Sequence, residues 1–146
     1  MDTKEILEYP SLVLSQSQRE AYFENGYLLL PGFVKKNLLT RIRMAAAEFV
    51  EQSRACIASD TKFDLQPGHT KEDPKLRRLS FPVDHHETFR EIAFDSPIVD
   101  VAADLLGPNV CYHHSKLNYK WSHGGLSLIH ISAPTRRYAI SYAVFS

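Results

Sequence analysis

The chain has 146 residues, of which 17 are basic and 17 are acidic, so its formal net charge is zero. This length is typical of no more than one domain. The balanced charge gives no indication of nucleic acid or of an anionic membrane surface as a partner. The N-terminus lacks the basic and apolar regions of a signal peptide, and no apolar run reaches the ~20 residues of a transmembrane helix. We therefore expect a cytoplasmic protein with no membrane partner.

The first predicted elements are a helix and a short strand. Residues 1–14 read as a lead-in. Ser15 and Ser17 each begin a capping-box pattern, so the sequence leaves two possible starts for the helix. Gly26 is a suitable left-handed stop for it. The apolar run at residues 27–30 then predicts a strand.

The middle of the chain is predicted to be mainly helical. Residues 37–57 place apolar side chains at helical spacing, which indicates an amphipathic helix packed on a core. The polar stretch 59–75 reads as a loop, and a strand over 77–81 follows. Residues 86–94 and 96–106 read as two short helices, the second with serine, proline and glycine at its expected ends.

Residues 109–121 are predicted to form one long strand with partial alternation. Successive side chains of a strand point to opposite faces, so His114, Lys116 and Asn118 are expected in a row on one face. We expect the apolar residues of the other face, Leu117, Tyr119 and Trp121, to lack partners.

Three segments together resemble the N-terminal half of the phytanoyl-CoA dioxygenase family. The first is L-S-Q-S-Q-R-E-A-Y-F-E-N-G-Y-L-L-L-P-G-F at residues 14–33. The second is S-P-I-V-D-V-A-A-D-L-L-G-P-N-V at 96–110, and the third is H-H-S-K-L-N-Y-K at 113–120. Their order and spacing carry the resemblance, which extends over about 14–125.

The resemblance implies an α+β chain that carries the N-terminal portion of a double-stranded β-helix, a jelly-roll or cupin-like fold that is incomplete here. Members of this family are Fe(II)- and 2-oxoglutarate-dependent oxygenases. The full-length parent would hydroxylate a small organic substrate with O2 and 2-oxoglutarate, giving succinate and CO2. Two histidines and one carboxylate would hold the iron and leave positions open for 2-oxoglutarate and O2.

The resemblance also implies which residues contact the cosubstrate. Asn118 matches a strand position whose amide contacts 2-oxoglutarate in some members. Lys116 is its neighbour on the same face, and Arg78 matches a basic residue that approaches the cosubstrate. The alternative is that Asn118 and Lys116 belong to an ordinary polar strand face.

The iron-binding motif of the family is absent from the sequence. Its first two ligands form an H-x-D motif shortly after the strand that ends near Trp121, and no H-x-D occurs anywhere in this chain. We therefore assign no catalytic residue and no metal ligand. The chain as written is expected to be inactive and to bind neither Fe(II) nor 2-oxoglutarate tightly.

The last 21 residues resemble a translated sequencing adapter. L-S-L-I-H-I-S-A-P-T-R is followed, after three residues, by I-S-Y-A-V-F-S. Ala133 and Ser146 depart from the adapter pattern, which has Glu and Cys there. We therefore expect residues 1–125 to be part of a phytanoyl-CoA dioxygenase-like domain and residues 126–146 to be non-native.

Two other classes of function stay open. A non-catalytic α+β interaction module would retain the same front half without an iron site. A small zinc protein would use His85, His86 and Glu87, although their spacing alone is weak evidence. Cys56 and Cys111 fit no metal or redox spacing and are expected to be free, buried thiols. The expected partner is a small-molecule substrate of the parent, with no nucleic acid, and the sequence leaves the oligomeric state open.

Overall fold

A computed structural model describes residues 2–121 as a mixture of helices and one small antiparallel sheet. This confirms the α+β content. The elements in chain order are α1 (Thr3–Glu8), α2 (Gln16–Asn25), α3 (Lys36–Ser53), β1 (Phe63–Leu65), β2 (Leu76–Ser80), α4 (Pro82–His85), α5 (Glu87–Phe94), α6 (Pro97–Leu106) and β3 (Lys116–Asn118).

The N-terminal lead-in contains one short helix, α1, that was not predicted. Asp2 caps α1 through a capping box with Glu5, in which each side chain accepts a hydrogen bond from the other residue's backbone N–H at 2.8 Å. Of the two possible starts for α2, the chain uses Ser15, whose hydroxyl accepts from the backbone N–H of Gln18. Gly26 ends α2 with a φ of 78°, as predicted.

The segment after α2 is not a strand in the structure. Tyr27 and Leu29 are 70% and 77% exposed, whereas Leu28 and Leu30 are half-buried. Burial therefore alternates along this apolar run as it would in a strand, but within residues 2–121 no strand pairs with this segment. A strand needs neighbours to satisfy its backbone groups, and the local pattern could not reveal whether they exist.

Helix α3 supplies one wall of the core. Ile42, Ala45 and Phe49 form its buried stripe, as the apolar spacing predicted. Phe49 is fully buried and clusters with Phe63 of β1 and with the buried leucines of β2. The core therefore lies between α3 and the inner face of the sheet.

The sheet has the strand order β1-β2-β3 and is antiparallel throughout. Strand β1 lies inside the stretch that was predicted to be a loop. Strand β3 has three residues in place of the predicted thirteen, because its partner β2 has only five residues and pairing ends with it. β2 itself ends before Phe81, whose φ of 51° turns the chain into α4.

The apolar residues near β3 have partners in the structure. Leu117 and Tyr119 pack against the core cluster. The Tyr119 hydroxyl donates to the backbone carbonyl of Ala46 at 2.8 Å, and the Trp121 indole N–H donates to the carbonyl of Leu76 at 2.7 Å. The strand face opposite Lys116 and Asn118 thus packs on the core cluster and on α3.

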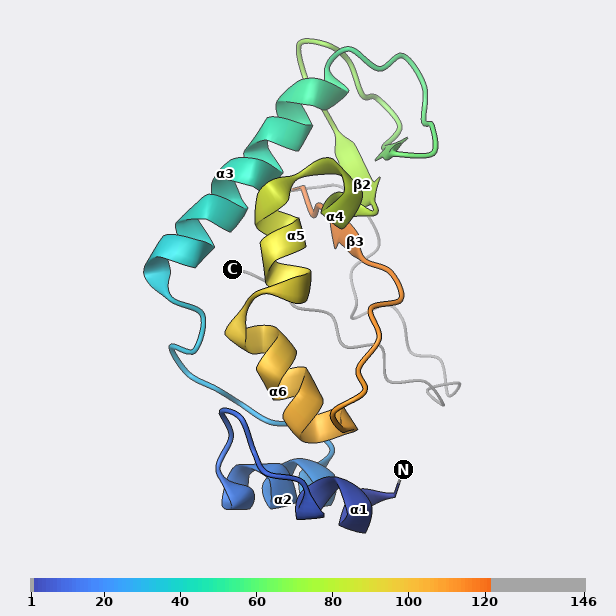
Figure 1. Cartoon of the computed structure of the whole chain (residues 1–146). Helices are drawn as coiled ribbons and strands as arrows, with labels where there is room; N and C mark the ends of the chain where they lie inside the picture. The colour runs from blue at the N-terminus through green and yellow to red at the C-terminus, as the bar shows by residue number, and fades with distance from the viewer. Residues whose placement is uncertain (1, 122–146) are drawn as a thin grey trace.

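The helices α4, α5 and α6 follow one another along the molecule (Figure 1). Ser96 caps α6, Pro97 is its first residue and Gly107 ends it, which confirms the predicted boundaries. Asp84 lies inside α4 and does not cap α5. The ring of His86 takes this role and accepts from the backbone N–H of Thr88.

The N-terminal helices are joined to α6 by two buried charged side chains. The carboxylate of Asp104 accepts hydrogen bonds from the backbone N–H groups of three consecutive residues, at 2.7–2.9 Å, in the segment between α1 and α2: Leu12, Val13 and Leu14. Arg19 of α2 donates to the carbonyls of Ile6, Tyr9 and Asp104. These bonds place α1 and α2 beside α6, at the end of the molecule away from the sheet (Figure 1).

None of the helices between residues 2 and 121 is both long and apolar enough to cross a bilayer. The adapter-like stretch 126–146 lies outside the described residues, and so does the proposed domain boundary at 125.

Candidate functional site

The outer face of the sheet brings together the three residues that the sequence singled out. Arg78 of β2 lies directly opposite Asn118 of β3, and Ser80 lies opposite Lys116. Backbone hydrogen bonds join Tyr119 to Arg77 and Phe81 to Ser115. The alternation of an antiparallel ladder then makes Arg78–Asn118 a non-hydrogen-bonded pair, in which side chains approach most closely.

The opposite, inner face of the sheet is apolar. Phe63, Leu79 and Leu117 are aligned across the three strands and pack in the core. Since side chains alternate between the faces of a strand, this burial holds the polar row outward. The row runs Asp64–Arg78–Asn118 across β1, β2 and β3.

A β-bulge adds a second arginine to this face. The register shifts between Asp64, which is opposite Arg78, and Leu65, which is opposite Leu76, so Arg77 is the extra residue of β2. A bulge redirects side chains that strict alternation would separate. Asp64 therefore pairs with both Arg77, at 2.5 Å and 3.0 Å, and Arg78, at 2.9 Å.

Asp64 and Arg77 were not predicted as site residues from the sequence. Asp64 lay in the stretch assigned to a loop. The usable signal was the pair of adjacent arginines in L-R-R-L-S, because two charged residues in succession break the alternation of a half-buried strand.

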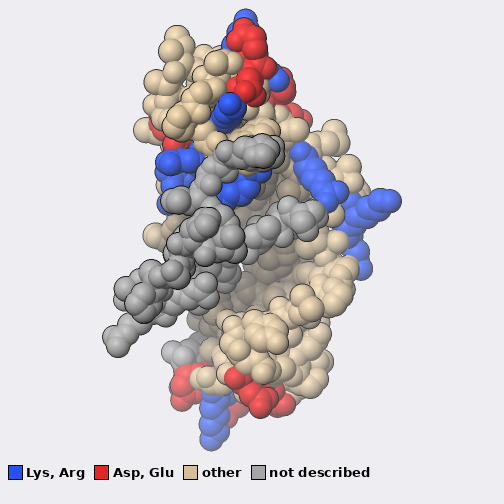
Figure 2. Space-filling model, turned by 180° about the vertical axis from the view of Figure 1, so that it is seen from behind, with Lys and Arg blue, Asp and Glu red and all other residues tan. Residues whose placement is uncertain are grey.

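The outer face is suited to an anion. Arg77, Arg78 and Lys116 share it with one carboxylate, Asp64, so positive charge is in excess. The Nε of Arg78 is buried and has no hydrogen-bond partner in the described part of the chain, although Arg78 as a side chain is 38% exposed. A buried donor without a partner indicates a missing acceptor. Figure 2 shows lysine and arginine side chains in several groups across the upper half of the view, with acidic side chains at its top.

The donor set fits a dicarboxylate such as 2-oxoglutarate. A guanidinium and an ammonium group bind carboxylate oxygens through charge-assisted hydrogen bonds, and an amide N–H adds a directional one. Arg78, Lys116 and Asn118 supply these three groups from adjacent strands.

The described residues do not supply ligands suitable for iron. Residues 2–121 contain no group of three or more histidine, cysteine or acidic side chains that could hold a metal ion. His85 and Glu87 are exposed, and the ring of His86 caps α5 with one nitrogen and lies 3.3 Å from a carboxylate oxygen of Glu48 with the other. The zinc pattern proposed for these residues therefore has a structural role for its central histidine.

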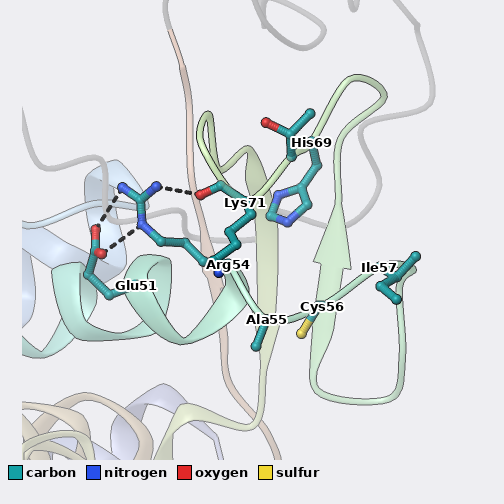
Figure 3. Close-up of a pocket in the computed structure, with 8 residues that line it drawn as sticks. Glu51, Arg54, Ala55, Cys56, Ile57, His69 and Lys71 are labelled. Atoms are coloured by element: carbon teal, nitrogen blue, oxygen red, sulfur yellow. Dashed lines mark hydrogen bonds and ion pairs between the residues drawn. The ribbon is translucent and has the colours of Figure 1, made fainter.

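A concavity of about 580 Å³ lies at the C-terminal end of α3 (Figure 3). Polar groups that line this concavity already form hydrogen bonds or ion pairs within the protein. Arg54 pairs with Glu51 and donates to the carbonyl of Lys71. The Nδ1 of His69 accepts from the backbone N–H of Lys75, and its Nε2 lies 3.1 Å from the carbonyl of Ser53.

The thiol at this concavity is poorly suited to chemistry. Burial raises the pKa of Cys56, and the thiolate is the reactive form of cysteine. Cys56 is half-buried and Cys111 is exposed, so the expectation of two buried thiols is wrong for Cys111, whereas both are free. The sheet face is therefore the better candidate site.

Comparison with known proteins gives two related oxygenases. The chain is 28% identical over 121 residues to a methylphosphonate hydroxylase of Gimesia maris, covering 83% of this chain and 45% of that protein. It is 27% identical over 111 residues to a probable alpha-ketoglutarate-dependent hypophosphite dioxygenase of Stutzerimonas stutzeri, covering 74% and 37%. No protein-family model matches the chain.

These similarities agree with the broader class that the sequence suggested, the 2-oxoglutarate-dependent oxygenases, and they do not name the phytanoyl-CoA dioxygenase family. The chain spans less than half the length of either relative.

Proposed function

We propose that residues 1–125 form the N-terminal part of a phytanoyl-CoA dioxygenase-like domain, an Fe(II)- and 2-oxoglutarate-dependent oxygenase on a double-stranded β-helix. The whole protein would hydroxylate a small organic substrate in the cytoplasm with O2 and 2-oxoglutarate, releasing succinate and CO2. The observation that carries this proposal is the alignment of Arg78 with Asn118, beside Lys116, on one outward sheet face.

In this proposal the residues of the chain bind and orient the cosubstrate. The guanidinium of Arg78 and the ammonium of Lys116 would contact carboxylate oxygens, while the amide of Asn118 would fix the orientation. Fe(II) and 2-oxoglutarate supply the oxidation chemistry when they are bound. Residues 2–121 provide no set of iron ligands, so these residues would act on the cosubstrate alone.

The relatives suggest a class of substrate. One is named for methylphosphonate and the other for hypophosphite, and both compounds are small phosphorus oxyanions. The excess of positive charge around Arg77, Arg78 and Lys116 suits a second small anion beside the cosubstrate. We propose that the parent protein oxidises a substrate of this class.

The adapter-like tail supports a further part of the proposal. Residues 126–146 would replace the native continuation of the chain, which would contain the H-x-D motif and the later iron and 2-oxoglutarate ligands. The 146-residue chain would then be inactive and would bind 2-oxoglutarate only weakly, at millimolar concentrations.

Replacing Arg78 with methionine is expected to weaken 2-oxoglutarate binding at least about tenfold, because a charge-assisted contact is lost. Dissociation constants would be measured by titrating the isotope-labelled 146-residue chain with 2-oxoglutarate and following its NMR chemical shifts. Arg43→Met is the matched control, since Arg43 is exposed on α3. The same titration with methylphosphonate tests the substrate class.

Two results would count against the proposal. If the unsubstituted chain gives no saturable shifts with 2-oxoglutarate, the face is not a cosubstrate site, and the non-catalytic interaction module becomes the better account. Equal weakening by the Arg78 and Arg43 variants would mean that binding reflects general charge. If methylphosphonate causes no shifts while 2-oxoglutarate does, only the substrate class is removed.

A further inference from the structure

Asp64 is an acidic residue at the centre of a face whose other charged residues are basic. Its side chain is only 17% exposed and lies between the guanidinium groups of Arg77 and Arg78. A carboxylate in an anion site lowers the local positive potential and so weakens the attraction for an anion. Asp64 must therefore favour binding in another way. The contacts of Asp64 indicate how it does so.

The two arginines contact Asp64 in different ways. Arg77 donates through both its Nε and its Nη2 to the Oδ2 of Asp64, so one edge of its guanidinium faces the carboxylate. The Nη2 of Arg78 forms an ion pair with the same oxygen, at 2.9 Å. Its Nε has no partner among residues 2–121 and is buried. Asp64 therefore holds one end of the Arg78 guanidinium and leaves another donor available.

The backbone makes this arrangement specific. The bulge at Arg77 brings both guanidinium groups to one carboxylate, and Asp64 is directly opposite Arg78 in the β1–β2 register. Arg78 is in turn opposite Asn118. Asp64 thus anchors Arg78 from the β1 side, on a strand whose other neighbour is β3.

We infer that Asp64 is a positioning residue for the cosubstrate site, which fixes the Arg78 guanidinium so that its unpaired Nε–H can bind a carboxylate of 2-oxoglutarate. This inference rests on the proposed function. An arginine side chain has several rotatable bonds, and ordering it before a ligand arrives lowers the entropic cost of binding. The gain from this order outweighs the loss of positive potential.

The test is an NMR titration of the full 146-residue chain with 2-oxoglutarate that follows the Nε–H resonance of Arg78. Asp64→Asn keeps the shape of the side chain and removes its charge. It is expected to weaken 2-oxoglutarate binding about tenfold and to reduce the ligand-induced shift of the Arg78 Nε–H. Asp64→Glu restores a carboxylate and is expected to recover part of both.

Asp73→Asn is the matched control, because Asp73 forms an ion pair with Lys75, at 3.0 Å, outside the sheet face. It should leave 2-oxoglutarate binding unchanged. A thermal melt of each variant separates positioning from unfolding, since a purely structural effect would move the melting temperature and would not be restricted to the Arg78 resonance.

The possible outcomes separate this inference from the proposed function. Unchanged or tighter binding in Asp64→Asn, with the unsubstituted chain binding normally, would overturn the role of Asp64 and leave the cosubstrate site intact. No saturable shift in the unsubstituted chain up to about 10 mM 2-oxoglutarate would overturn both. Weaker binding with equal shifts in Asp64→Glu and Asp64→Asn would also contradict positioning.

Discussion

Replacing Asp104 with alanine is expected to lower the free energy of unfolding by about 3–5 kcal/mol. The substitution leaves the backbone N–H groups of Leu12, Val13 and Leu14 without their acceptor. It also removes the negative charge near Arg19, which is only 2% exposed. Chemical denaturation followed by circular dichroism would measure the change.

Asp100→Ala is the control for Asp104. Asp100 lies in the first turn of the same helix, where a carboxylate interacts favourably with the helix dipole, and its removal should cost less than about 1 kcal/mol. Equal losses in the two variants would show that the bonds to the segment between α1 and α2 do not hold the N-terminal helices in place.

The pH dependence of stability should change in the same variant. Burial acts to raise the pKa of Asp104, but hydrogen bonds from three backbone N–H groups and the charge of Arg19 outweigh it, so the pKa is lowered. The stabilisation is therefore fully present above the unfolded value of about 3.9 and is lost as the pH falls through the lower folded pKa. Asp104→Ala should lose less stability than the unsubstituted chain over that acid range.

Replacing Phe49 with alanine is expected to lower the free energy of unfolding by about 4 kcal/mol. Phe49 has no exposed surface, and its ring centroid lies 6.5 Å from that of Phe63, 6.2 Å from that of Phe89 and 5.9 Å from that of His86. The substitution would leave a cavity where α3 packs against α5 and the sheet. Denaturant titration would measure the loss.

Met44→Ala is the matched control for Phe49, because Met44 lies on the same helix and is 60% exposed. Its effect should stay within about 0.5 kcal/mol. Since Phe49 supports the inner face of the sheet, Phe49→Ala should also broaden the NMR signals of the outer row Asp64–Arg78–Asn118. A loss below about 1 kcal/mol would mean that the core lies elsewhere.

Local signals predicted the helices better than the strands. The stripe of α3 and the caps of α6 depend on residues a few positions apart, so the sequence contains the information that determines them. Strands depend on partners far away in sequence. For this reason the apolar run at residues 27–30 predicted a strand that finds no partner among residues 2–121, and β1 was missed inside a polar stretch.

The role of Asp104 in holding the N-terminal helices against α6 was also not predicted. Asp104 lies near the C-terminal end of α6, where a carboxylate opposes the helix dipole. That position was a usable signal, because an unfavourable charge near a helix end indicates a compensating partner. The identity of the partner, a backbone segment some 90 residues away, could not be inferred from local spacing.

The candidate site was predicted in part. Lys116 and Asn118 were expected on one strand face, and Arg78 was carried over by resemblance; the structure aligns all three. The roles of these residues stay predictions. Asp64 and Arg77 enter through a β-bulge, and a bulge depends on strand register, which the sequence did not determine.

The most direct test of the account is to resequence the source locus across the codons for residues 121–126, with adapter sequence removed. We predict that the reading frame continues past Gly125 into an H-x-D motif within a few residues. That result would supply the first iron ligands of a 2-oxoglutarate-dependent oxygenase and define the chain to assay. If the genomic DNA instead encodes L-S-L-I-H-I-S-A-P-T-R followed by the remaining residues and a stop codon, the proposal of an interrupted oxygenase is contradicted.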